Sequence, residues 1–291
     1  MAKLKKNKIF GVIGFPVKHS LSPIMHNAVF KRLGINATYR AFEVRPEELK
    51  KFVQGLKRNS ISGLNITIPH KENILPLLRE VQDIPGLARS IGAVNTVKME
   101  DGKPVGYNTD GLGFIRALKS LGFDFREKKV ALLGAGGAAK AIVFNVAEEK
   151  ASSISIYDVD SIRSQDLVKR LKTKFPRQIK LAKNVEELHI PKCDILVNAT
   201  PVGMHDDRII IPLEYLHKEL FIYDLVYNPK GRKTTRLVVE AKKKGLKAHD
   251  GIWMLVFQGA ISSKIWFPKV DEREVASIMF EGLRNEGFFA Q

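Results

Sequence analysis

The stretch VALLGAGGAA, residues 130–139, decides the fold of this chain of 291 residues. An apolar strand runs into the spacing Gly-x-Gly-x-x-Ala, and a helical pattern follows directly. Gly134 permits a tight turn, Gly136 lets the backbone approach a pyrophosphate, and Ala139 lets the helix lie close to the strand. The N-terminus of the helix that follows supplies N–H donors and partial positive charge, which favour an anion. The stretch predicts a Rossmann-type dinucleotide site, and the alternative is a glycine-rich turn that serves packing alone.

The sequence around this stretch alternates short β-branched runs with helical patterns. Such alternation implies a parallel sheet with right-handed crossovers, so this half of the chain predicts a doubly wound α/β domain. The predicted strands are 129–133, 153–157, 179–181, 194–199 and 220–226, and the last of these ends the predicted sheet.

The first half also mixes strands and helices, but with different turn chemistry. Strands are expected at 8–13, 38–44, 63–68, 94–99 and 103–107, and the last two are joined by an Asp101-Gly102 hairpin turn. Ser22 is expected to cap a helix whose first residue is Pro23. We therefore predict two α/β domains: residues 1–110 for substrate binding and catalysis, and residues 111–250 for the dinucleotide. Residues 251–291 form helical patterns that we expect to return to the first domain.

Composition narrows the class of protein. The formal net charge of +17 is spread over all predicted surface elements, and the lysine clusters lack the interleaved aromatic residues of a nucleic-acid groove, so we expect no nucleic-acid partner. No apolar run is long enough for a membrane span, and no secretory signal is evident. The single cysteine, Cys193, excludes an intrachain disulfide, and the scattered histidines predict no metal site. A cytoplasmic protein fits best.

An acidic residue at the end of the second sheet strand bears on the cofactor. Asp158 lies 24 residues after Gly134, close to the position of the acid that binds a ribose 2′-hydroxyl. A carboxylate there repels the 2′-phosphate of NADP and so favours NAD. Arg163, nearby, is the residue that could bind such a phosphate. The alternative role for Asp158 is a helix N-cap.

Polar residues interrupt the packing pattern of the first half in four places. Ser20 and Ser22 flank a helix entrance, where hydroxyls and N–H groups together can bind a carboxylate. The run LNITIPHK, residues 64–71, alternates apolar and polar residues and ends in Lys71. Asn95 and the run YNTDG, residues 107–111, add an amide and a carboxylate. Together they suit a polyhydroxylated small-molecule ligand.

This set of motifs closely resembles the shikimate dehydrogenase family across nearly the whole chain. The resembling stretches are Ser20 to Pro23, Asn65 to Lys71, Gly92 to Thr96, Asn108 to Gly111, Gly134 to Ala139, Asn198 to Thr200, Asp224 to Tyr227, and Gly251 with Gln258. The resemblance implies reversible reduction of 3-dehydroshikimate to shikimate by a nicotinamide nucleotide, in the biosynthesis of aromatic amino acids.

The resemblance also implies roles for individual residues. Lys71 and Asp110 form the catalytic pair, which agrees with the need of a developing alkoxide for a proton or a positive charge. The implied carboxylate ligands are Ser20, Ser22 and Tyr227, and the implied hydroxyl ligands are Asn65, Thr67, Asn95, Asp110 and Gln258. The implied cofactor ligands add Thr200, Met204 and Gly251 to Gly134, Gly136, Gly137, Ala138, Asp158 and Arg163. Which of Lys71 and Asp110 transfers the proton is left open.

The chain departs from the family where the cofactor is selected. NADP-dependent members carry an Asn-Arg-Thr-like run where this chain has Asp158-Val159-Asp160, so NAD is favoured although NADP is the commoner family cofactor. In this respect the chain resembles family members that oxidise quinate. The alternative function is therefore a quinate/shikimate dehydrogenase that uses NAD. A remote alternative from another class is a nucleotide-sensing protein without enzymatic activity. We expect a monomer or a homodimer.

Overall fold

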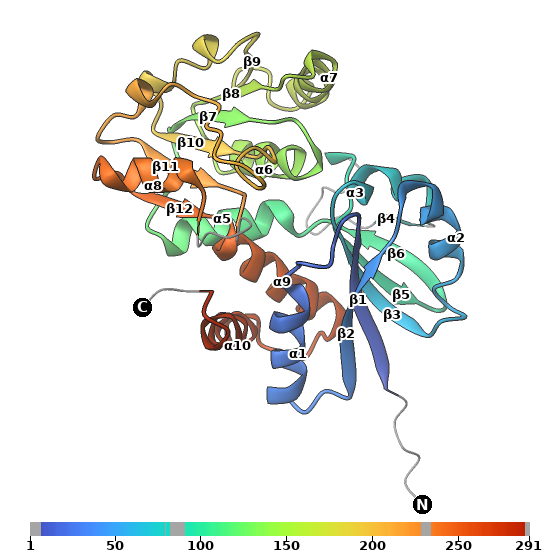
Figure 1. The fold of residues 1–291 in the computed structure, drawn as a ribbon. Coiled ribbons are helices and arrows are strands. Elements are labelled where there is room, and N and C mark those ends of the chain that lie inside the picture. The colour runs from blue at the N-terminus through green and yellow to red at the C-terminus, as the bar shows by residue number, and fades with distance from the viewer. Residues whose placement is uncertain (1–6, 79, 82–90, 228–233, 289–291) are drawn as a thin grey trace, which may run out of the picture. The chain divides into compact units, whose positions relative to one another are not determined.

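The computed structural model describes residues 7–78, 80–81, 91–227 and 234–288. The chain divides into two compact units (Figure 1). The first comprises residues 1–113 and 255–291, and the second comprises residues 114–254.

The first unit contains a mixed sheet of six strands in the order β2-β1-β3-β5-β6-β4 (Figure 1). Strands β2, β1 and β3 are parallel to one another, whereas β5 is antiparallel to both β3 and β6. The predicted hairpin is confirmed, because Glu100 pairs with Lys103 across a turn in which Asp101 and Gly102 have positive φ. The strands are β1 (Lys8–Gly14), β2 (Ala37–Glu43), β3 (Ile61–Ile66), β4 (Glu80–Val81), β5 (Thr96–Glu100) and β6 (Lys103–Tyr107).

Alternation along β1 gives this sheet two apolar faces. Phe10 contacts the rings of Phe30 and Trp266 on one face, whereas Ile13 belongs to a buried cluster with Leu49 and Val53 on the other. Helices therefore cover both faces of the sheet. The helices of this unit are α1 (Ser22–Arg32), α2 (Leu49–Gln54), α3 (His70–Asn73), the start of α5 (Asp110–Ser120), most of α9 (Ile252–Trp266) and α10 (Glu272–Asn285).

The second unit contains a fully parallel sheet of six strands in the order β12-β11-β10-β7-β8-β9. The chain reverses its direction of travel across the sheet between β7 and β10, and a doubly wound sheet binds ligands at such a switch point. The predicted α/β fold is confirmed. The elements are β7 (Lys129–Leu133), α6 (Gly137–Glu148), β8 (Ser153–Tyr157), α7 (Ser161–Lys172), β9 (Ile179–Leu181), β10 (Ile195–Asn198), β11 (Phe221–Asp224), α8 (Arg236–Lys243) and β12 (Ala248–Asp250).

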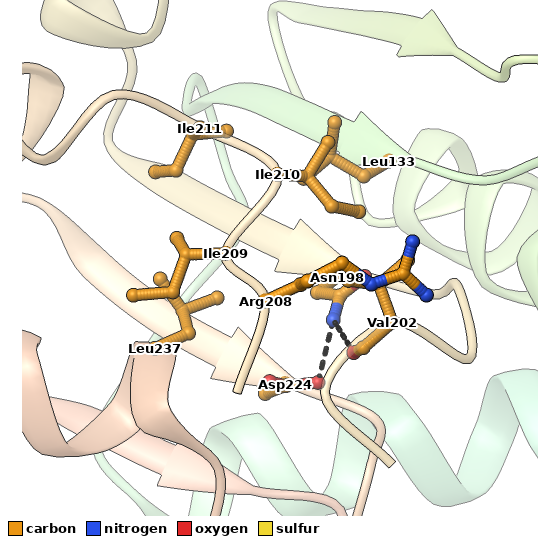
Figure 2. A pocket seen from close by; sticks show the side chains of 9 residues that line it. All are labelled: Leu133, Asn198, Val202, Arg208, Ile209, Ile210, Ile211, Asp224 and Leu237. Carbon is orange, nitrogen blue, oxygen red and sulfur yellow. Dashed lines mark hydrogen bonds between the residues drawn. The ribbon is translucent and has the colours of Figure 1, made fainter. Parts of the chain in front are cut away.

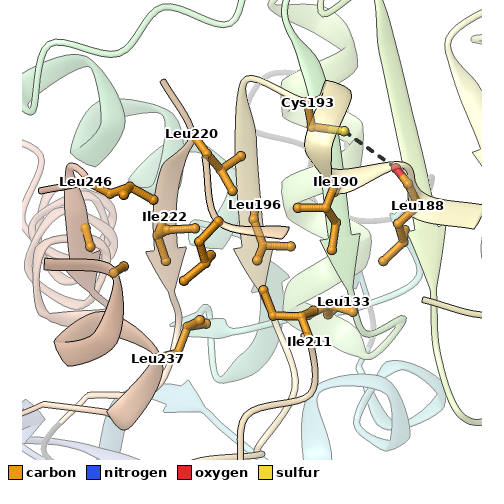
Figure 3. Packing of buried hydrophobic residues seen from close by; sticks show 14 of the residues in the cluster. Leu133, Leu188, Ile190, Cys193, Leu196, Ile211, Leu220, Ile222, Leu237 and Leu246 are labelled. Carbon is orange, nitrogen blue, oxygen red and sulfur yellow. Dashed lines mark hydrogen bonds between the residues drawn. The ribbon is translucent and has the colours of Figure 1, made fainter. Parts of the chain in front are cut away.

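Branched aliphatic side chains fill one face of this parallel sheet. Leu133, Leu196 and Ile222 project from three neighbouring strands toward Leu237 of α8 and Ile211 (Figure 3). All five are less than 6% exposed. Burying such a side chain contributes about 1.5–3 kcal/mol, so this cluster holds the switch point of the sheet in place.

The structure differs from the sequence prediction in two respects. Strand β3 ends at Ile66 instead of residue 68, so Thr67 lies in the connection that leads to α3. Pro69 has no N–H group for a sheet ladder, which accounts for the early end. The parallel sheet also continues beyond the predicted last strand, because Ala248–Asp250 adds β12. Within the described residues, no helix has the length and hydropathy of a membrane span.

Candidate functional site

A partly buried ion pair joins two helices of the first unit. Lys71 belongs to the short helix α3, and Asp110 is the first residue of α5. Lys71 Nζ lies 2.5 Å from Asp110 Oδ2, and the two side chains are only 16% and 5% exposed. The helix dipole favours a negatively charged group in the first turn of a helix, where Asp110 lies.

Asn95 fixes the second oxygen of this carboxylate. Its Nδ2 donates to Asp110 Oδ1 at 2.8 Å, while its Oδ1 accepts the backbone N–H of Thr109 at 2.7 Å. These opposite requirements determine which way the Asn95 amide points. The Asp110 N–H is bound in turn by Asn108 Oδ1 at 3.0 Å. Lys71, Asn95 and Asp110, predicted separately from the sequence, are therefore brought together.

Gln258 reaches the same group of side chains from α9. Its Oε1 accepts a hydrogen bond from Asn95 Nδ2 at 3.3 Å, and its Nε2 donates to the Leu255 carbonyl at 2.7 Å. A Cβ atom at Gly113 of α5 would lie 2.7 Å from both Cβ and backbone N of Gln258. Only glycine allows this approach of the helices, so Gly113 sets the position of Gln258.

Asn65 is the centre of a second buried network. Tyr39 donates its hydroxyl to Asn65 Oδ1 at 2.7 Å, and Asn65 Nδ2 donates to Ser262 Oγ at 3.0 Å and Thr96 Oγ1 at 3.2 Å. Sequence reasoning missed Tyr39, Thr96 and Ser262 as parts of the site. The signal for Thr96 was its place in the Gly92–Thr96 stretch, and that for Ser262 was a polar residue within a strongly apolar helix.

Ser20, Ser22 and Thr67 follow the carboxyl ends of two neighbouring strands, β1 and β3. Ser22 is not the helix cap that the sequence predicted: the N-cap is Leu21, and Ser20 Oγ accepts the Ser22 N–H at 3.3 Å. Ser22 is only 4% exposed, and its hydroxyl has no hydrogen-bonding partner within the described parts of the chain. A nearly buried hydroxyl in this state is suited to a polar ligand.

Thr67 occupies space that a side chain on β1 would fill. A Cβ atom at Gly14 would overlap the methyl group of Thr67. The two connections are also tied by the Phe15 N–H, which donates to the Ile68 carbonyl at 3.0 Å. The absence of a side chain at Gly14 thus fixes where Thr67 lies beyond the strand.

The glycine-rich turn of the second unit has the expected geometry. Gly134 adopts a φ of +103°, and a Cβ atom there would lie 2.9 Å from the Ala199 carbonyl oxygen. Gly136 is the N-cap of α6, and its missing side chain faces open space. The helix N-terminus at Gly137 and Ala138 therefore offers N–H groups beside room for a phosphate, so the residues fit a dinucleotide.

Asp158 does not cap the helix that follows the second sheet strand. Asp158 Oδ2 accepts the Ala135 N–H at 2.6 Å, and its Oδ1 accepts the Asp160 N–H at 2.9 Å. Asp160, not Asp158, caps α7 by accepting the N–H groups of Ile162 and Arg163. Arg163 Nε lies 3.3 Å from Asp160 Oδ2, so its guanidinium group is already paired. Asp158 joins the second strand directly to the glycine-rich turn.

Polar residues at the carboxyl ends of β10 and β11 form another network, shown in Figure 2. Asn198 Nδ2 donates to Asp224 Oδ1 at 2.9 Å and to the Val202 carbonyl at 3.3 Å. The Thr200 hydroxyl donates to Asn198 Oδ1, and the Thr235 hydroxyl donates to Asp224 Oδ2, both at 2.7 Å. Burial raises the pKa of Asp224 to about 7 although these donors and the Val226 N–H oppose the shift.

The structure also gives the local surroundings of the remaining predicted residues of this unit, Met204, Gly251 and Tyr227. The Met204 N–H donates to the Pro201 carbonyl at 3.1 Å within the turn after β10. A Cβ atom at Gly251 would overlap the Leu225 carbonyl, so close packing alone requires glycine there. Tyr227 is partly exposed. Among the described residues, no group of three His, Cys, Asp or Glu side chains could hold a metal ion.

These features define a class: an α/β protein with a Rossmann-type dinucleotide unit and a second α/β unit that carries a partly buried lysine–carboxylate pair. The model of the shikimate dehydrogenase substrate binding domain matches residues 12–97, and that of shikimate / quinate 5-dehydrogenase matches residues 116–238. The chain belongs to the shikimate dehydrogenase family.

Individual relatives agree with this assignment. A shikimate dehydrogenase (NADP(+)) of Aquifex aeolicus is 43% identical over 262 residues, which cover 90% of this chain and 91% of the relative. A crystal structure of shikimate dehydrogenase from Aquifex aeolicus matches with a TM-score of 0.86 at 39% identity. The match covers 96% of this chain and 98% of the chain in the crystal structure. A shikimate 5-dehydrogenase from Listeria monocytogenes, in complex with shikimate and NAD, has a TM-score of 0.81 at 36% identity, with coverages of 94% and 96%.

Proposed function

We propose that this protein catalyses the reversible reduction of 3-dehydroshikimate to shikimate with a nicotinamide dinucleotide. The single observation that carries the proposal is the partly buried pair of Lys71 and Asp110, whose carboxylate is fixed by Asn95. Membership of the family supplies the substrate class, and the pair supplies the proton chemistry that a ketone reduction requires.

The chemistry of the pair follows from its geometry. The bound dinucleotide supplies the hydride that adds to the ketone carbon. The oxygen of that ketone gains negative charge, which the Lys71 ammonium stabilises and then neutralises with a proton. Asp110 accepts one N–H of this ammonium group and so directs the other two. Both oxygens of Asp110 are occupied, one by Lys71 and one by Asn95, and we therefore assign proton transfer to the lysine.

The polar groups around the pair are proposed as substrate ligands. The Ser22 hydroxyl, nearly buried and without a partner within the described residues, supports a carboxylate subsite at the entrance of α1 with Ser20. We extend the carboxylate role to Tyr227 on the family resemblance. Hydroxyl recognition is assigned to a ring of polar side chains: Asn65, Thr67, Asn95, Asp110 and Gln258.

We propose NAD as the preferred cofactor. The carboxylates of Asp158 and Asp160 stand after β8, and Asp160 pairs with Arg163, so a 2′-phosphate would meet the uncompensated negative charge of Asp158 and would compete with Asp160 for the Arg163 guanidinium group. The relatives include both an NADP(+) enzyme and a complex with NAD. Gly134, Gly136, Gly137 and Ala138 are assigned to the pyrophosphate, and Thr200, Met204 and Gly251 to the nicotinamide half.

The remaining proposals concern organisation. We propose residues 1–110 as the substrate and catalytic domain, 111–250 as the dinucleotide domain and 251–291 as helices that belong with the first. A monomer or homodimer in the cytoplasm, with a small-molecule substrate and no nucleic-acid or membrane partner, is the proposed setting.

One kinetic experiment tests substrate and cofactor together. Initial rates of nicotinamide reduction are measured with shikimate and with quinate, each with NAD and with NADP, on the wild type and on Lys71→Ala. The proposal expects the highest kcat/KM with shikimate and NAD. Preference for quinate would make the enzyme a quinate dehydrogenase, preference for NADP would refute the role of the two carboxylates, and no turnover in any combination would refute the enzymatic function.

A further inference from the structure

We propose that Ser262 of α9 is a positioning residue, which orients the amides of Asn65 and Asn95 for the reaction without touching substrate. The inference rests on the proposed function, because it assigns those amides to the substrate site. The observation that carries it is a buried hydroxyl cluster formed by Thr96, Thr109 and Ser262, all of which are fully buried.

Ser262 Oγ is the meeting point of this cluster. It lies 3.0 Å from Asn65 Nδ2, 2.8 Å from Thr96 Oγ1 and 3.3 Å from Thr109 Oγ1, and 3.0 Å from the carbonyl oxygen of Gln258. An amide nitrogen only donates, so Ser262 accepts from Asn65. Its single proton is then directed to the Gln258 carbonyl, one turn earlier in α9, or to one of the threonine hydroxyls. All three hydroxyls are fully buried, so each must find its hydrogen-bonding partners within the protein.

Both amides of the site depend on this arrangement. Asn65 Oδ1 accepts the Tyr39 hydroxyl, so its NH2 group faces Ser262. Asn95 Oδ1 accepts from Thr96 Oγ1 at 3.1 Å and from the Thr109 N–H at 2.7 Å, and Asn95 Nδ2 donates to Thr109 Oγ1 and to Asp110 Oδ1, both at 2.8 Å. Three hydrogen bonds therefore lead from Ser262 through Thr109 and Asn95 to the catalytic carboxylate.

Removing the Ser262 hydroxyl takes away one of the acceptors for the NH2 group of Asn65. Asn65 Nδ2 keeps only Thr96 Oγ1 and the distant Asn95 carbonyl, at 3.4 Å, as acceptors. Thr96 loses one of its hydroxyl partners at the same time, so its bond to Asn95 Oδ1 is altered. An unsatisfied buried group is costly, and the network relaxes by shifting both amides. The displacement reaches Asp110 through Asn95.

Ser263 provides a matched control on the same helix. It is the next residue, is also fully buried, and its hydroxyl bonds to His26 Nδ1 at 3.2 Å. Within the described residues, His26 Nε2 has no hydrogen-bonding partner, and the ring stacks on Tyr39, so Ser263 acts on the Asn65 network only through this ring and makes no hydrogen bond to it. Ser262→Ala and Ser263→Ala therefore each remove one buried hydroxyl, but only the first removes it from the site.

The test compares these two variants with the wild type. For Ser262→Ala we expect kcat/KM for shikimate to fall about tenfold, because misplacement of catalytic groups has effects of this size or larger. The KM for the dinucleotide should stay unchanged, and the pH profile of kcat should shift. Ser263→Ala should change these constants less than twofold. Thr96→Val combined with Ser262→Ala should cost less than the sum of the single changes, because both act on one network.

A second measurement does not depend on turnover. The side-chain NH2 resonances of Asn65 and Asn95 in a nitrogen-15 correlation spectrum should both shift in Ser262→Ala, and the Asn95 resonances should stay in place in Ser263→Ala. Unshifted resonances, or kinetic changes equal in the two serine variants, would overturn the positioning role. An inactive wild type would instead refute the proposed function, and the spectrum would then decide the role of Ser262 in orienting the amides.

Discussion

Replacing Asp224 with asparagine should remove a large part of the pH dependence of stability. The pKa of this buried carboxyl rises from its ordinary value of 3.8 to about 7, chiefly because the side chain is removed from water: the residue is only 1% exposed. The charge of Asp250, its register partner on the next strand, raises the pKa further. A raised pKa means that the native state holds the proton more tightly than the unfolded state. The contribution to stability is complete below pH 3.8 and is lost as the pH rises through 7.

The magnitude follows from the same two values. Between pH 5 and pH 8 the group costs the wild type about 2.5 kcal/mol of unfolding free energy. The asparagine amide would keep an acceptor toward Asn198 and Val226 and present an N–H toward the Thr235 hydroxyl, so the network survives the change. The loss of stability from pH 5 to pH 8 should therefore be smaller in Asp224→Asn than in the wild type by this amount.

The assay is urea unfolding at both pH values, followed by far-ultraviolet circular dichroism and by tryptophan emission. The unfolding free energy is obtained for each protein and each pH, and the difference of differences isolates the titration of residue 224 together with its coupling to Asp250. Titrating groups that do not interact with residue 224 are common to both proteins and cancel. If the wild type and Asp224→Asn lose stability equally between pH 5 and pH 8, the argument that burial drives this pKa upward is wrong.

Three further changes test the site. Lys71→Ala should lower kcat about a thousandfold, because it removes the group that stabilises the developing oxyanion. The affinity for the dinucleotide, measured by calorimetry, should stay the same. A kcat near that of the wild type would exclude Lys71 as the proton donor. Gly113→Ala should force α5 away from Gln258, with a cost of about 1–3 kcal/mol in thermal unfolding and a raised KM for shikimate; an unchanged KM would contradict the positioning of Gln258 by this glycine. Asp158→Asn with Val159→Arg should raise kcat/KM for NADP about tenfold and lower that for NAD, since a guanidinium group replaces repulsion with attraction; an unaltered ratio of the two constants would count against selection by this loop.

The sequence is most informative where local chemistry is sufficient. The strand at 129–133 is predicted with its observed bounds, because a short apolar run followed by glycines leaves few alternatives. The hairpin at Asp101-Gly102 is equally clear, since both positions require positive φ. By contrast, the pattern misses β12, because three residues that include His249 and Asp250 have no strand periodicity.

The separate polar runs of the first half also indicate a site by their residue types. Lys71, Asn95 and Asp110 lie in three different stretches, and in the sequence only the family resemblance joins them. In the structure, β3, β5 and the start of α5 bring them within hydrogen-bonding distance. Asp158 shows the opposite case, because the sequence does not decide between a ribose ligand and a helix cap, and the cap proves to be Asp160.

Periodicity and backbone requirements within a few residues were sufficient to predict the two α/β folds, the glycine-rich turn and the residue types of the site. Which polar groups are bound to one another depends on the packing of the whole chain. Ser262 joined the site, and the Asp224 carboxyl acquired its raised pKa, through burial among residues distant in the sequence. Hydrogen-bond direction and desolvation depend on all neighbouring atoms, and no local pattern in the chain encodes them.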